Sequence, residues 1–212
     1  MRILITAATP AELLPAQEIC ETIKYHDIKT MVTGIGATAT AYHTLKALSA
    51  APNRPFDVAI NTGIAGSFCD SLPVGSVVRV VSDYFGDCGM QTASGFQSLF
   101  DAHLLDADTF PFRSGKLAPD KLVPEWEAAL AFLPLAEGVT VQHLVEGCPP
   151  PAPSKVETME GAAFFYVCMY EHIPCIALRA VSNKAGERDK SKWDIPLSLS
   201  ALKKTLANIL HL

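Results

Sequence analysis

Positive charge, paired cysteines and long apolar runs are all scarce in this sequence of 212 residues. Lysine and arginine number 17 against 22 aspartates and glutamates, and the net charge of -5 argues against nucleic acid or an anionic membrane surface as the main partner. The six cysteines include no C-x-x-C pair, which indicates reduced thiols rather than a disulfide framework or a zinc site. The first apolar run is too short for a signal peptide, and no run is long enough to span a membrane. We therefore expect a cytoplasmic protein.

Apolar residues, by contrast, are plentiful: 49% of the chain is hydrophobic and 18% is charged, which is typical of a globular protein with a substantial core. Runs of strand length alternate with segments of helical length, which predicts one three-layer α/β domain over residues 1–212 around a largely parallel sheet. Strands are expected over 3–8, 29–32, 56–61, 76–81, 139–145 and 176–182, and helices over 10–19, 38–48, 126–132, 158–170 and from 194 onward. Residues 84–118 are expected to be long loops with short pieces of structure, and the proline-rich run 149–153 a stiff loop.

Polar and glycine residues gather at the expected carboxyl ends of the strands, where ligands bind in open α/β sheets. Glu12 follows the first strand, Thr-Gly-Ile-Ala-Gly at 62–66 follows the third, and Asn183 follows the last. Gly34-Ile-Gly36 follows the second strand but lacks a third glycine, so it is a poor match to a dinucleotide-binding fingerprint. Taken alone, Glu12 is better explained as a carboxylate that the dipole at a helix start stabilises, and the glycines as tight turns.

Two charged residues lie in apolar surroundings. Glu160 belongs to the run Val156-Glu-Thr-Met-Glu-Gly-Ala-Ala163, and Arg179 lies inside the last expected strand. A charge in such a place is costly unless it is paired, so each residue serves either a structural ion pair or a functional site.

Together these segments resemble the signature of the purine nucleoside phosphorylase and nucleosidase superfamily. The likeness is carried by Val156–Ala163, by Arg179-Ala-Val-Ser-Asn183, and by Asn61-Thr-Gly-Ile-Ala-Gly66 followed by Leu72-Pro-Val-Gly-Ser76. Tyr84-Phe-Gly-Asp-Cys-Gly89 and the segment 186–196 look like the futalosine hydrolase branch, which belongs to the alternative menaquinone pathway. The resemblance covers most of the chain except about residues 99–155. Nucleosidases usually carry Val-Glu-Met-Glu-Ala, whereas here Thr158 is inserted and Gly161 replaces the alanine.

The resemblance implies a phosphorylase/hydrolase-like αβα fold with a mixed, largely parallel sheet, a purine nucleoside substrate, no cofactor and no metal. Glu12 falls where hydrolytic members keep the carboxylate that activates water. Glu160 would bind the ribose 2′ and 3′ hydroxyls, for which acceptor-only oxygens are suited, while Met159 packs on the sugar. Arg179 would hold Glu160 or the water in place.

The resemblance also assigns residues to the base and to the 5′ end of the nucleoside. Asn183, oriented by Ser182, would stabilise the departing base as negative charge builds on it. Trp193 corresponds to a pocket phenylalanine of relatives and would face the 5′ substituent of futalosine, an aromatic carboxylate that Lys190 or Lys192 could approach. The central glycine segment would supply the remaining binding residues, which are Thr62, Gly63, Ala65 and Gly66.

The first loop favours hydrolysis over phosphorolysis, because Thr9-Pro-Ala-Glu12 offers phosphate no cation and Glu12 would repel it. We therefore expect a hydrolase that releases hypoxanthine from futalosine and forms a homodimer or larger homo-oligomer. An adenine-releasing methylthioadenosine/adenosylhomocysteine nucleosidase is the alternative enzyme, and a non-catalytic nucleoside sensor is the alternative of another class.

Overall fold

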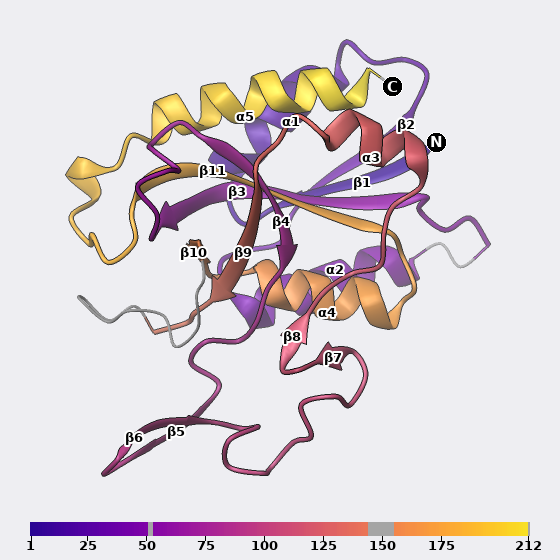
Figure 1. The fold of residues 1–212 in the computed structure, drawn as a ribbon. Helices are drawn as coiled ribbons and strands as arrows, with labels where there is room; N and C mark the ends of the chain where they lie inside the picture. The colour runs from indigo at the N-terminus through magenta and orange to yellow at the C-terminus, as the bar shows by residue number, and fades with distance from the viewer. Residues whose placement is uncertain (51–52, 144–154, 212) are drawn as a thin grey trace.

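A seven-stranded sheet lies between two layers of helices in the computed structural model, which describes residues 1–50, 53–143 and 155–211 (Figure 1). The strand order is β10-β9-β4-β11-β3-β1-β2, and the pairs β11–β4 and β10–β3 are antiparallel while the others are parallel. Its strands are β1 (Arg2–Ala7), β2 (Asp27–Val32), β3 (Val58–Ser67), β4 (Val77–Ser82), β9 (Leu135–Thr140), β10 (Val156–Thr158) and β11 (Cys175–Lys184). The mixed, largely parallel sheet confirms the expected αβα fold.

The helices cover both faces of the sheet (Figure 1). One layer holds α1 (Pro10–Cys20), α3 (Pro124–Leu130) and α5 (Ile195–Leu210), and the other holds α2 (Ala37–Ser49) and α4 (Gly161–Tyr170). None of the helices within the described ranges combines the length and apolarity needed to cross a bilayer.

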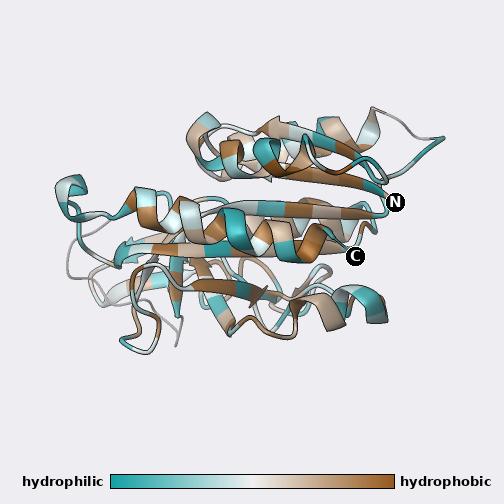
Figure 2. Ribbon diagram, turned by 90° about the horizontal axis from the view of Figure 1, so that it is seen from above, coloured by the Kyte–Doolittle hydropathy of each residue, from teal (hydrophilic) through white to brown (hydrophobic). Residues whose placement is uncertain are grey.

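The strands alternate their side chains between two apolar cores. In β1, Ile3 and Ile5 pack with Leu202 of α5, whereas Leu4 packs on the opposite face with Phe164 of α4. The brown, hydrophobic stretches of Figure 2 accordingly follow the strands and the helix faces turned toward them.

Residues 84–118 leave the sheet in two short hairpins, as the sequence predicts. They are β5 (Gly89–Thr92) with β6 (Gly95–Ser98), and β7 (Phe112–Arg113) with β8 (Lys116–Leu117). Figure 1 shows this excursion below the α2–α4 layer.

Three of the expected element boundaries are wrong. Residues 62–66, expected as a loop, belong to β3, because their backbone continues the ladder with β11 as far as Ser67 and Lys184. The strand expected over 139–145 is β9, which begins directly after Pro134 and ends at Thr140. The helix expected from residue 158 begins at Gly161, because Val156–Thr158 pairs with β9 and β3 as β10. The expected proline-rich loop lies outside the described residues.

The short strand β10 closes a ring of strands that positions the site. It runs parallel to β9 and also pairs antiparallel with the end of β3, so β3, β11, β4, β9 and β10 form a closed circuit. Gly66 in β3 is consequently the register partner of Glu157 on one side and of Asn183 on the other.

Candidate active site

A cavity of about 340 Å³ opens where β1, β3, β10 and β11 end. Most of the predicted site residues line it: Glu12, Ala65, Gly66, Met159, Glu160, Ser182, Asn183 and Trp193. Thr62, Gly63 and Arg179 are buried and are not among the residues that line the cavity, so contact of Thr62 and Gly63 with substrate stays a prediction. A second hollow, of about 660 Å³, lies at the opposite ends of β1 and β2, around Met1 and Asp27.

The Glu12 carboxylate is held by hydrogen bonds on both oxygens. Thr9 caps α1 by accepting from the Glu12 backbone N–H at 3.3 Å, and its hydroxyl donates to Glu12 Oε2 at 2.7 Å. The backbone N–H of Ile64 donates to Glu12 Oε1 at 3.0 Å. A Cβ at Gly63 would lie 2.8 Å from this oxygen, so the glycine leaves the space in which Glu12 meets β3.

Glu160 lies at the N-terminus of α4, and its Oε1 accepts a hydrogen bond of 2.8 Å from the backbone N–H of Gly36. Gly36 has a φ of 90°, a conformation that favours glycine, and this turns its N–H toward the carboxylate. Burial raises the pKa of the Glu160 carboxyl, the Gly36 N–H and the charge of Arg179 lower it, and the charge of Glu12 raises it again. The two predicted acids, Glu12 and Glu160, are therefore close enough for the charge of one to affect the pKa of the other.

Asn183 lies buried at the end of β11 with its amide oriented by neighbours. The Ser182 hydroxyl donates to Asn183 Oδ1 at 2.7 Å, and Asn183 Nδ2 donates to the Lys184 carbonyl at 2.8 Å. Each amide atom keeps one further hydrogen-bonding position, because Nδ2 carries two hydrogens and Oδ1 two lone pairs. The orientation of Asn183 by Ser182 is as expected.

Arg179 makes different contacts from those expected. It is buried and donates through Nη1 to the carbonyls of Asn61 and Leu178, at 3.1 and 2.9 Å, and through Nη2 to Asn61 Oδ1. Among the described residues no ion pair joins it to Glu160. Burial lowers the pKa of Arg179, while the charges of Glu160, Asp83 and Glu12 raise it. The positive charge of the guanidinium therefore lowers the pKa of Glu160 and Asp83 without a direct ion pair to Glu160 among the described residues.

Asp83 is a buried acid that the sequence analysis missed. Thr140 Oγ1 donates to its Oδ1 at 3.0 Å, and the same hydroxyl accepts from the Ala162 N–H at the start of α4. Burial raises the pKa of the Asp83 carboxyl to about 7, although Thr140 and the charge of Arg179 lower it. Within the described residues no donor reaches Asp83 Oδ2.

This acid explains where the glutamate motif departs from the nucleosidase pattern. A Cβ at Gly161 would lie 2.2 Å from Asp83 Oδ2, so the alanine of other nucleosidases would require the buried Asp83 side chain to shift. Thr158, the inserted residue, caps α4 by accepting a hydrogen bond of 3.2 Å from the Gly161 N–H.

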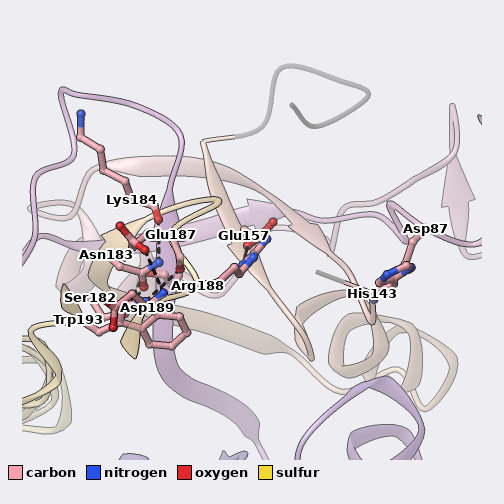
Figure 3. A network of polar contacts seen from close by, with 11 residues as sticks. Asp87, His143, Glu157, Ser182, Asn183, Lys184, Glu187, Arg188, Asp189 and Trp193 are labelled. Carbon is pink, nitrogen blue, oxygen red and sulfur yellow. Dashed lines mark hydrogen bonds and ion pairs between the residues drawn. The ribbon is translucent and has the colours of Figure 1, made fainter. Parts of the chain in front are cut away.

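The cavity wall also contains an ion pair that the sequence analysis missed. Arg188 Nη1 donates to Glu157 Oε1 at 3.0 Å, and both residues line the cavity (Figure 3). Trp193 donates from Nε1 to the Glu187 carbonyl at 3.0 Å, which holds its ring at the cavity. Of the two lysines considered for a substrate carboxylate, Lys190 lines the cavity and Lys192 pairs with Glu187.

Metal ligands are not clustered in the described part of the chain: no group of three or more His, Cys, Asp or Glu side chains is placed to hold an ion. The cavity lining supplies carboxylates, an amide and hydroxyls.

A solved structure with the same architecture is that of the 5′-methylthioadenosine/S-adenosylhomocysteine nucleosidase of Neisseria meningitidis. It matches with a TM-score of 0.78 at 20% identity, over 99% of this chain and 98% of that chain, so the fold is that of a nucleosidase. No protein-family model matches the chain.

Curated relatives define the family. A futalosine hydrolase of Streptomyces coelicolor is 31% identical over 81% of this chain and 74% of its own length. A 5′-methylthioadenosine/S-adenosylhomocysteine nucleosidase of Shewanella halifaxensis is 28% identical over 79% of this chain and 73% of its own length. The chain belongs to the family of futalosine hydrolases and methylthioadenosine/adenosylhomocysteine nucleosidases, and it is a purine nucleosidase, an N-glycosyl hydrolase.

Proposed function

We propose that this chain hydrolyses the N-ribosidic bond of futalosine, releasing hypoxanthine and dehypoxanthine futalosine for menaquinone biosynthesis. The observation that carries the proposal is the convergence of Glu12, Glu160 and Asn183 on one cavity. The resemblance to the Streptomyces coelicolor futalosine hydrolase supports the choice of substrate.

Glu12 is the general base in the proposed reaction. Its carboxylate, held by Thr9 and Ile64, orients a water on the sugar face and takes its proton while the hydroxyl adds to C1′ of the ribose. The C1′–N9 bond breaks with its electron pair on the base, and the sugar passes through an oxocarbenium-like state. The backbone N–H of Gly36 keeps Glu160 placed to accept from the ribose hydroxyls, and Met159 packs on the sugar.

Asn183 stabilises the leaving base. Its amide nitrogen donates to a carbonyl at position six, and its oxygen accepts from N7 once the base has taken up a proton from solvent. The bond to the carbonyl oxygen strengthens as charge moves onto hypoxanthine, and the bond from N7–H forms only once N7 has taken up its proton. Both therefore favour the transition state over bound substrate. The Ser182 hydroxyl on Asn183 Oδ1 favours this orientation of the amide.

Product analysis tests the proposal. Wild-type protein incubated with futalosine, inosine or methylthioadenosine should release hypoxanthine from futalosine most efficiently, as seen by chromatography. Glu12→Gln should bind the nucleoside but lose about two to four orders of magnitude in rate, because the amide cannot accept a proton from water. Efficient adenine release from methylthioadenosine with none of hypoxanthine from futalosine would instead support the adenine-releasing alternative. A homo-oligomer, a single domain over the whole chain and a cytoplasmic location are also part of this proposal.

A further inference from the structure

The ion pair between Glu157 and Arg188 has no part in the proposed mechanism, although it forms part of the cavity wall. Its side chains are only 12% and 24% exposed, and the separation of Nη1 and Oε1 is 3.0 Å. Removing two charges from water is costly, and a pair of apolar residues is often as stable. Figure 3 shows the Arg188 side chain directed at Glu157, and both residues line the same cavity as Asn183 and Trp193.

Glu157 and Asn183 stand on either side of a residue without a side chain. Both are register partners of Gly66, Glu157 through β10 and Asn183 through β11. Partners in register on adjoining strands direct their side chains to the same face of a sheet. Two interstrand spacings separate them, roughly 10 Å between Cα atoms. A Cβ at Gly66 would lie 3.0 Å from the Ala185 Cα and 3.2 Å from Asn183 Nδ2, so the glycine lets the Ala185 backbone and the Asn183 amide approach β3. Gly66, Glu157 and Asn183 all line the cavity, which therefore lies between the carboxylate and the amide.

We propose that the part of the cavity between Glu157 and Asn183 holds the base, and that Glu157 accepts a hydrogen bond from N1–H of a 6-oxopurine while Asn183 contacts N7 and the carbonyl at position six. The inference rests on the proposed function and specifies which purine the site selects. Hypoxanthine presents a donor at N1, whereas adenine presents a lone pair there. A carboxylate is an acceptor only, so Glu157 matches hypoxanthine and repels adenine at this atom.

Arg188 gives the carboxylate the orientation and the charge balance that this role requires. A guanidinium only donates, so it occupies Glu157 Oε1 and leaves the second oxygen for the base. Its positive charge also offsets that of Glu157, which would otherwise oppose the negative charge building on the leaving base.

The test is Glu157→Gln, which keeps the shape of the side chain. Because Arg188 cannot accept, it takes the oxygen of the glutamine and turns the amide N–H toward N1. That donor opposes N1–H of hypoxanthine and matches N1 of adenine. We expect kcat/KM for hypoxanthine release from futalosine to fall about 10- to 100-fold, the worth of one charged hydrogen bond, while adenine release from methylthioadenosine does not fall.

Glu137→Gln is the matched control, because Glu137 of β9 pairs with Lys116 at 2.7 Å outside the cavity. It should leave the adenine-to-hypoxanthine ratio unchanged. Calorimetric binding of the free bases should give the same selectivity change as turnover in Glu157→Gln. A wild type that releases no hypoxanthine refutes the proposed function. If the wild type releases hypoxanthine but Glu157→Gln is weakened equally toward both bases, only the role of Glu157 is refuted.

Discussion

Asp83 makes the stability of this protein depend on pH in the direction opposite to that of an ordinary ion-paired carboxylate. Burial lifts the pKa of its carboxyl from 3.8 to about 7. Below the pKa of the unfolded chain, Asp83 is protonated in both the folded and the unfolded state, so its contribution to stability is fully present. As pH rises toward the folded value, the unfolded chain gives up its proton while the native state retains it, and stability is lost. At about 1.4 kcal/mol per pH unit, the three-unit shift corresponds to a loss on the order of 4 kcal/mol between pH 4 and pH 8.

Asp83→Asn removes this dependence, since asparagine has the shape of the protonated acid and can still accept from Thr140. Urea unfolding should give similar free energies for the variant and the wild type near pH 4. At pH 8 the variant should be the more stable by a few kcal/mol, a large share of a typical total. Asp120→Asn, at a carboxylate whose side chain is 87% exposed, is the control and should show no such divergence. If the difference between Asp83→Asn and wild type is the same at both pH values, the buried-acid argument is wrong.

Three further predictions concern the cavity. Gly63→Ala places a Cβ 2.8 Å from Glu12 Oε1 and should lower kcat about 100-fold, while calorimetry should show that nucleoside binding is retained. An unchanged kcat would show that the position of Glu12 does not matter for the reaction. Asn183→Asp should depress hypoxanthine release and raise the adenine-to-hypoxanthine ratio in product chromatography, and an unmoved ratio would contradict its role. Trp193→Ala should raise KM about tenfold for futalosine but little for inosine, which lacks the aromatic 5′ group, so equal effects would remove Trp193 from that pocket.

The parts of the fold and site that the sequence predicts are those with local signals. Alternating runs of strand and helix length are enough to predict the layers and the largely parallel sheet. Glu12, Glu160 and Asn183 could be identified as candidates because each stands at the end of an expected element or in a recognisable motif. The boundaries of β3 were missed because the glycines at 62–66 are ordinary turn signals. Here they leave room for the Glu12 carboxylate and for the Ala185 backbone within a continuous ladder.

The remaining features depend on partners far apart in the chain. Arg179 binds Asn61, 118 positions away, so no pattern around the arginine indicates its partner. Gly161 is required by Asp83, which belongs to another strand end and carries no local sign of burial. Glu157 stands in the motif that carries the resemblance, but only the pairing of β10 with β3 and the contact with Arg188 place it at the cavity.

The closed circuit of strands has a consequence for how the chain avoids aggregation. Because β10 returns to β3, the one strand of the described seven-stranded sheet with a single neighbour is β2. An open edge of unpaired backbone groups is a template for intermolecular pairing. On β2 this edge is six residues long and carries exposed Asp27 and Lys29, which a second chain would have to desolvate in order to add a strand. Closing the sheet on one side thus leaves the described seven-stranded sheet with one short, charged edge where a second chain could pair with its backbone.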